Sequence, residues 1–248
     1  MSALNEAIQN LVIANRVLAH EGVLDAYGHV SMRHPTDPGR YLLSRSRSPE
    51  LVEAGDIIEF TLDGKPASAD ARPPYLERFI HGSIYQARRE INSVVHSHAD
   101  EVVPFSISKS TKLRPVWHAA GRCGFDIPVW DIADKFGDTN LLVVNGAQGD
   151  DLAQRLGSNR VVLMRGHGFA AAGETLIDAL WMSIYLPHNA RMYMDALKLG
   201  EVKVLSPGEI AEFQKMQPNS PAMQRAWEYW ARRAGCESLI AGAAATQK

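Results

Sequence analysis

A short β-branched run ends in two histidines that are two positions apart, and this feature limits what the chain can fold into. Residues 93–95 are followed by His96 and His98. Such a run, bounded by polar residues, predicts a strand, and side chains two apart on a strand point to the same face. The two imidazoles could therefore hold one metal ion. A pair of surface histidines at a strand end is the alternative, and the short motif alone does not separate the two.

The composition is that of an ordinary globular protein. The 248 residues are 46% hydrophobic and 22% charged, and the formal net charge is −2. We find no basic stripe typical of nucleic-acid binding, no apolar stretch long enough to span a bilayer and no secretory signal pattern. Cys123 and Cys236 indicate no disulfide framework. We therefore expect a cytoplasmic protein whose partner is a small molecule, not a nucleic acid or a membrane.

Strand and helix signals alternate along the chain, without an internal repeat. Helices are expected over residues 4–18, 73–88, 99–107, 174–199 and 222–234. Strands are expected over residues 30–33, 41–44, 56–61, 93–95, 141–144 and 161–164, and residues 113–118 are expected to be extended. This order indicates one α/β domain over residues 1–240, in which helices cover a sheet. Residues 241–248 are small and polar and are expected to be a disordered tail.

A catalytic metal site needs a third protein ligand and one open position. His167 is the best candidate for that ligand. It follows the apolar run 161–164 and lies between Gly166 and Gly168, which permit a tight turn. A hairpin with an incidental histidine is the alternative interpretation.

Glu77 could supply the acid or base of such a site, although Glu77 and His81 are also spaced as an ordinary solvated pair on a helix. Glu77, the later His-x-His pair and the glycine-bracketed His167, in this order, resemble the class II aldolase/adducin family. The loop of residues 28–33 is similar to the Gly-Asn-Val-Ser-x-Arg loop of that family. The resemblance covers the chain from its first helix to about residue 200.

The resemblance implies a single-domain α/β fold with a central, mainly antiparallel sheet flanked by helices. It also implies a homo-oligomer, usually a tetramer, with its sites between subunits. In the family, the positions of His96, His98 and His167 bind a divalent metal, and that of Glu77 is the catalytic acid or base. Three histidines suit zinc best, although manganese, cobalt or iron could be held by the same set.

The chain departs from the sugar-phosphate aldolases of the family where those enzymes hold phosphate. Tyr75 and Leu76 replace a pair of serines, and His29 replaces an asparagine. Arg45 and Arg47 stand in a loop that is small and contains glycine in those aldolases. Arginine binds carboxylates through two parallel hydrogen bonds. We therefore expect a carboxylate substrate oriented by Arg45, helped by His29, whereas Arg47 is equally consistent with a solvated or interface loop.

This pattern more closely resembles the decarboxylase-like branch of the family, which acts on carboxylated dihydroxyaromatics or carboxylated muconic semialdehydes. The resemblance implies a metal-dependent decarboxylase of aromatic catabolism, in which the carbanion delocalises onto metal-bound oxygen as an enolate. The catalytic residues would be Glu77, His29 and Arg45. The residues expected against the substrate are Arg45, Tyr75, Ser31, Ser44, His118 and Tyr185.

Two other functions stay open. A metal-dependent aldolase that cleaves a 4-hydroxy-2-oxo acid or a related hydroxy acid would form the same intermediate. A non-enzymatic module like the adducin head would keep the fold without the metal, but the retained Glu77 and histidines argue against it. Core packing is the alternative for His118. His188 could approach the metal as a fourth ligand or protonate the product, but a position on the helix surface near a subunit interface is favoured. The aromatic residues between 227 and 230 are expected to pack or to form an interface.

Overall fold

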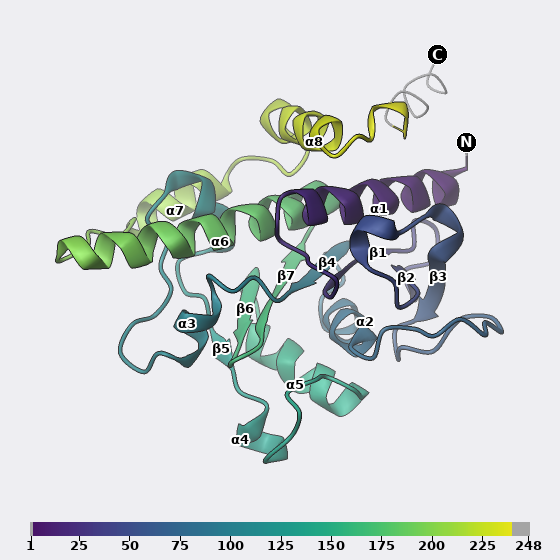
Figure 1. Ribbon diagram of the computed structural model, residues 1–248, viewed down its shortest axis with the longest axis horizontal. Coiled ribbons are helices and arrows are strands. Elements are labelled where there is room, and N and C mark those ends of the chain that lie inside the picture. The colour runs from purple at the N-terminus through teal and green to yellow at the C-terminus, as the bar shows by residue number, and fades with distance from the viewer. Residues whose placement is uncertain (1, 240–248) are drawn as a thin grey trace.

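A seven-stranded sheet forms the centre of the protein (Figure 1). The computed structural model describes residues 2–239, so the expected tail over 241–248 lies outside the described residues. The strand order is β3-β2-β1-β4-β7-β6-β5, and only the pair β5–β6 is parallel. The mainly antiparallel sheet expected from the family resemblance is thus confirmed. The strands are β1 (His29–Arg33), β2 (Arg40–Ser44), β3 (Ile57–Thr61), β4 (Ser93–Ser97), β5 (Val129–Trp130), β6 (Val161–Met164) and β7 (Gly168–Gly173).

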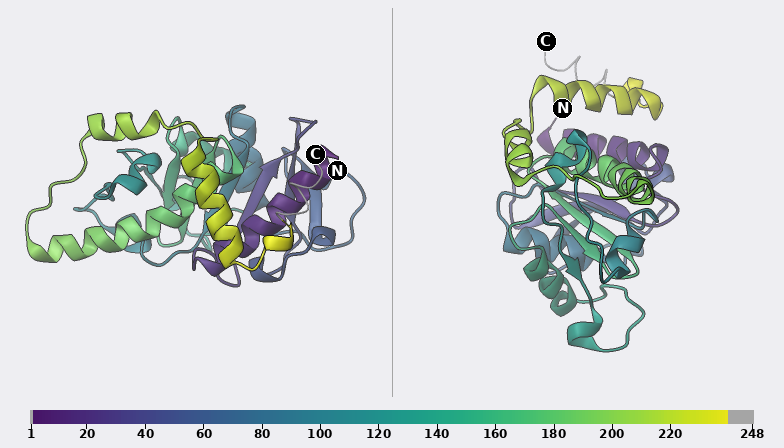
Figure 2. Two further views of the ribbon diagram at one scale, coloured as in Figure 1. Left: turned by 90° about the horizontal axis from the view of Figure 1, so that it is seen from above. Right: turned by 90° about the vertical axis from the view of Figure 1, so that its left-hand side faces the viewer.

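Helices cover both faces of this sheet (Figure 1). On one face lie α1 (Ala3–His20), α6 (Leu176–Leu199) and α8 (Pro221–Arg233), and on the other α2 (Arg78–Ala87) and α5 (Gly146–Leu156). Figure 2 shows that α8 lies across α1, on the side of α1 that faces away from the sheet. The shorter elements are α3 (Val103–Ile107), α4 (Ala133–Phe136), α7 (Pro207–Gln214) and the 3-10 helices η1 (Pro49–Leu51), η2 (Ala54–Asp56) and η3 (His118–Cys123).

The alternation of side chains along the central strands decides where the histidines point. In β4, Val95 packs into the core under α1 and α6, whereas Val94 packs into the core under α2 and α5. Ala171 and Ala170 of the neighbouring β7 divide in the same way. His96 is two residues from Val94 and therefore shares the side that α2 and α5 cover.

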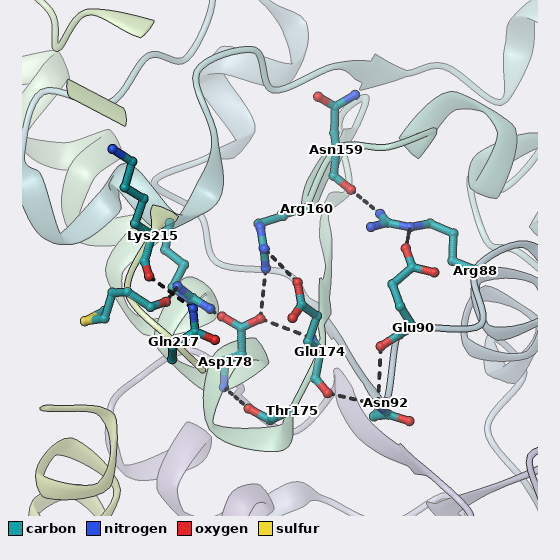
Figure 3. A network of polar contacts seen from close by, with 12 residues as sticks. Arg88, Glu90, Asn92, Asn159, Arg160, Glu174, Thr175, Asp178, Lys215 and Gln217 are labelled. Atoms are coloured by element: carbon teal, nitrogen blue, oxygen red, sulfur yellow. Dashed lines mark hydrogen bonds and ion pairs between the residues drawn. The ribbon is translucent and has the colours of Figure 1, made fainter. Parts of the chain in front are cut away.

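A buried ionic network fixes the start of α6 (Figure 3). Asp178 is fully buried, and its carboxylate accepts hydrogen bonds from Arg122 of η3 and, at 3.0 Å, from Arg160 just before β6. The backbone N–H of Glu174 donates to the same carboxylate at 3.1 Å. Thr175 caps the helix by accepting from the N–H of Asp178. The network therefore joins α6, η3 and β6, which are distant in the sequence.

We expect Asp178→Ala to lower the free energy of unfolding by about 3–5 kcal/mol, because it leaves the buried Arg122 without its counter-charge. Asp195→Ala is the matched control, since Asp195 pairs with Lys198 on the exposed side of the same helix. That change should cost less than about 0.5 kcal/mol. Urea unfolding of the two variants measures both values, and equal losses would contradict a structural role for the network.

Two expected helices are shorter in the structure. The helix expected over residues 73–88 begins only at Arg78, because the preceding segment runs extended beside the end of β2. There the N–H of Ser46 donates to the carbonyl of Pro73 at 2.8 Å, and Arg45 forms a bridge with Pro74. The helix expected over residues 99–107 is reduced to α3, which begins at Val103 after a turn.

The strand expected over residues 141–144 is wrong, because side chains take its backbone hydrogen bonds. In residues 141–144, the N–H of Val143 donates to Glu77 at 3.0 Å and that of Val144 donates to Gln148 at 2.8 Å. Residues 113–118 run along α6, where Asn189 bonds the backbone on both sides of Pro115. These side-chain hydrogen bonds take the place of strand pairing, and both segments stay outside the sheet.

Within residues 2–239, none of the helices combines the length and the apolar character that crossing a bilayer requires.

Candidate metal centre

Four side chains from distant parts of the sequence converge beside the central strands. Glu77, His96, His98 and His167 each offer one ligand atom, and these atoms lie within 4.8 Å of one another. The Nε2 atom of His98 lies 3.0 Å from the Nε2 atoms of both His96 and His167. The Oε2 atom of Glu77 lies 3.3 Å from Nε2 of His96 and 3.6 Å from Nε2 of His167. Ligands about 2 Å from a tetrahedral zinc ion would be about 3.3 Å apart, so the set fits a divalent cation.

The tautomer of His96 suits a metal ligand. Its Nδ1 atom lies 3.0 Å from the carbonyl oxygen of Phe169 on the paired strand β7. A carbonyl only accepts, so Nδ1 carries the proton and Nε2 turns a lone pair toward the cluster. Burial, with the charges of His96 and His167 added, lowers the pKa of His98 to about 4. The His98 ring is therefore neutral at neutral pH, as metal binding requires.

Two glycines bring His167 to the cluster. The N–H of His167 donates to the carbonyl of Met164 at 3.1 Å and closes the turn between β6 and β7, in which Gly166 has a φ of +64°. A Cβ atom on Gly168 would lie 2.0 Å from the carbonyl oxygen of Ser97. Only glycine allows this approach, which packs the turn against the end of β4 beside His98.

Glu77 stands immediately before α2 and is 6% exposed. Its Oε1 atom accepts the N–H of Val143 at 3.0 Å, which leaves Oε2 for the cluster. Burial acts to raise the pKa of Glu77, but His96 and His167 outweigh it and hold this pKa well below its usual range. The carboxyl group is thus ionised at neutral pH. It is not paired with His81, which turns toward His29 instead.

A pocket of about 380 Å³ adjoins the cluster. Its lining includes Glu77 and His98, the cation Arg47, and the apolar surfaces of Tyr75 and Leu76. The volume is that of a small-molecule site, and the mixture of apolar walls with a few polar groups is typical of such sites.

The structure places Arg47, and not Arg45, in the lining of the pocket. Arg45 does not line the pocket, because its Nε atom donates to Asp56 at 2.7 Å. Arg47 lines the pocket and donates to the other oxygen of Asp56 at 2.6 Å. Burial acts to raise the pKa of Asp56, but the N–H of Glu53 and both arginines outweigh it and lower the pKa. One buried carboxylate therefore orients two cations.

Of the other residues expected against the substrate, Tyr75 and His29 line the pocket, with their ring centroids 4.5 Å apart. Ser31 and Ser44 do not reach it, since both side chains are fully buried. The hydroxyl of Ser31 instead lies 2.7 Å from Nδ1 of His81 and 2.7 Å from the hydroxyl of Tyr85.

His118 and Tyr185 do not meet the cluster of their own chain. Tyr185 packs against the core under α6, with its ring centroid 5.1 Å from that of Trp117, on the opposite face of the sheet from His96. His118 is an exposed residue of η3, beside Phe213 of α7. The sequence analysis missed Asp56 and left the role of Arg47 open, because no local pattern shows which loop side chain turns inward.

The fold and the convergent Glu-plus-three-histidine cluster define a class II aldolase-type lyase. Residues 9–194 match the class II aldolase and adducin N-terminal domain, and the chain belongs to this family. It is 32% identical to the decarboxylase TropJ of Talaromyces stipitatus over 91% of this chain and 92% of that protein. It is 30% identical to the 3,4-dihydroxyphthalate decarboxylase of Arthrobacter keyseri, over 90% and 92% of the two chains.

The crystal structure of an aldolase II superfamily protein from Pseudomonas syringae has the same fold, with a TM-score of 0.79 at 20% identity over 96% of both chains. The resemblance to the decarboxylase-like branch is confirmed, and the chain is a lyase of the decarboxylase or aldolase type.

Proposed function

We propose that this protein is a metal-dependent decarboxylase of a non-phosphorylated, carboxylated dihydroxyaromatic or ring-cleavage product in aromatic catabolism. The observation that carries the proposal is one pocket lined by Glu77, His98, Arg47 and apolar walls. Two relatives that match almost along their whole lengths are decarboxylases by name, and one is named for a dihydroxyphthalate.

His96, His98 and His167 would hold the cation, with Glu77 beside them. Three imidazoles favour zinc, and manganese, cobalt or iron are also compatible with the set. A bound divalent ion would supply a Lewis acid for two neighbouring oxygens of the substrate.

Arg47 would orient the substrate through a carboxylate, because Arg47 lines the pocket and its guanidinium is held by Asp56. The ionised Glu77 would take the proton of a substrate hydroxyl. As the bond to the leaving carboxylate breaks, Glu77 would return this proton to the carbon that loses CO₂. The reaction consumes one proton overall, and the solvent supplies it when the phenol hydroxyl is restored.

An aldolase that cleaves a 4-hydroxy-2-oxo acid is the second candidate, because Arg47 and Glu77 could serve both reactions and the family is named for aldolases. The zinc-loaded and manganese-loaded proteins should be given dihydroxybenzoates, dihydroxyphthalates and a 4-hydroxy-2-oxo acid. We expect CO₂ from a carboxylated dihydroxyaromatic. Release of pyruvate and an aldehyde without CO₂ would establish the aldolase instead, and no product from any of these acids would contradict both.

We expect Arg47→Ala to raise the KM for a carboxylated substrate by about 10–100-fold, the equivalent of one charge-assisted hydrogen bond. Arg40→Ala is the control, since Arg40 pairs with Glu59 and Asp37 and does not line the pocket. Steady-state kinetics of the two variants give the comparison. An unchanged KM in Arg47→Ala, with a raised KM in Arg45→Ala, would show that Arg45 binds the substrate carboxylate instead.

We also propose a homo-oligomer in the cytoplasm, a tetramer by the family resemblance. The exposed side chains of Met192, Leu197 and Leu199 on α6 would suit such an interface. Sedimentation of the purified protein as a monomer would contradict this assembly.

A further inference from the structure

A buried chain of hydrogen bonds runs from the pocket into the protein. The Nδ1 atom of His29 lies 2.6 Å from Nε2 of His81, and Nδ1 of His81 lies 2.7 Å from the hydroxyl of Ser31. The hydroxyl of Ser31 lies 2.7 Å from that of Tyr85. All four side chains are at most 3% exposed, and among them only His29 lines the pocket. The other three therefore act on a substrate only through His29.

The four side chains joined by these hydrogen bonds are uncharged at neutral pH. Burial lowers the pKa of His81 to about 3. The 2.6 Å contact between Nδ1 of His29 and Nε2 of His81 has room for a single proton, so one of these two nitrogens is a bare acceptor. Burial raises the pKa of Tyr85. Each imidazole and each hydroxyl thus carries one proton, so three hydrogen bonds share four protons.

The number of protons decides which group donates and which accepts in each hydrogen bond. Among residues 2–239, the Tyr85 hydroxyl has Ser31 as its one side-chain or backbone acceptor. When Tyr85 donates to Ser31, Ser31 donates to Nδ1 of His81 and Nε2–H of His81 donates to Nδ1 of His29, all three buried donors have an acceptor. In the opposite direction, the buried proton of Tyr85 would have no acceptor, at a cost of about 1–3 kcal/mol.

We propose that Tyr85, Ser31 and His81 are positioning residues that hold His29 in the tautomer protonated on Nε2. His29 then offers the pocket an N–H donor. The ring of Tyr75 at 4.5 Å and that of His96 at 5.1 Å fix the plane of this imidazole. The substrate atom opposite His29 is therefore a hydrogen-bond acceptor, such as a carboxylate or phenolate oxygen. This last step rests on the proposed function, whereas the tautomer does not.

The tautomer can be measured without any substrate. Protein labelled with ¹⁵N-histidine, both zinc-loaded and treated with EDTA, should show His29 with a proton on Nε2 and a bare Nδ1. The His29→Gln variant assigns its signals. We expect Tyr85→Phe and Ser31→Ala to give a mixture of tautomers at His29. His29 protonated on Nδ1 in the wild type, or the same pure tautomer in both variants, would overturn the proposal.

Tyr41→Phe is the matched control. Tyr41 is also fully buried, and its ring is stacked with that of His81. Its hydroxyl donates to the carbonyl of Arg78 and takes no part in the hydrogen bonds that lead to His29. Tyr41→Phe should therefore leave the His29 tautomer unchanged. With an active substrate in hand, Tyr85→Phe should lower kcat by about 3–10-fold at an unchanged KM and metal content, since one neutral hydrogen bond is worth about 1 kcal/mol. A wild type without decarboxylase activity would contradict the proposed function and leave the tautomer measurement to decide this inference.

Discussion

Replacing His96 with alanine is expected to reduce the bound metal of zinc-reconstituted protein from about one ion per chain to below about a tenth, and to abolish turnover. His96 Nε2 is within 3.3 Å of ligand atoms of both Glu77 and His98. The carbonyl of Phe169 fixes the orientation of the His96 ring, so the substitution removes an oriented ligand. Elemental analysis after dialysis gives the metal content, and an assay of CO₂ release gives the activity.

His20→Ala is the control for this variant, because His20 lies exposed in the last turn of α1. It should keep both metal and turnover. Thermal melting must show that His96→Ala is folded, since the imidazole is fully buried. A folded His96→Ala protein that still holds a full equivalent of zinc would rule out His96 as a ligand.

Glu77→Gln is expected to keep zinc at saturating concentration and to lower kcat by about 10²–10⁴-fold. The amide preserves the size of the side chain and can still accept the N–H of Val143 through its oxygen. It cannot take up and return a proton, which is the step assigned to Glu77. Glu59→Gln is the control, because Glu59 pairs with Arg40 away from the pocket.

Two experimental results would assign a different role to Glu77. Turnover near that of the wild type would make the carboxylate structural. A loss of zinc in proportion to the loss of turnover would make it chiefly a metal ligand, consistent with its distances of 3.3 and 3.6 Å from the histidine nitrogens.

Strong periodicity made much of the fold predictable. The apolar spacing over residues 4–18, 174–199 and 222–234 corresponds to α1, α6 and α8. Strand β7 (Gly168–Gly173) was not expected, because its glycines and alanines have low intrinsic strand preference. Pairing with β4 and β6 on its two sides makes it a strand nonetheless. Such tertiary pairing cannot be seen in a local window.

The four residues of the cluster were predictable from the sequence, whereas the residues around it were predictable only in part, as with Tyr75 and His29. Strand alternation predicted that His96 and His98 share a face, and the family resemblance added Glu77 and His167. Ser31 was misplaced because its strand is buried under His81 and Tyr85 of α2, a contact between segments fifty or more positions apart. The choice between Arg45 and Arg47 depends on Asp56, which the loop sequence does not relate to either.

The central place of β4 has a consequence for how the proposed metal centre would gain and lose an ion. β4 is the fourth of seven strands and pairs with β1 and β7 on its two edges. Amides in such a strand exchange with solvent only through the rarest openings of a protein. The imidazole of His96, which we propose as a metal ligand, is therefore preorganised by the global fold, unlike the ligands of zinc fingers, which order only around their metal. Divalent ions could replace one another here at the rate of ligand dissociation, with no backbone unfolding in between.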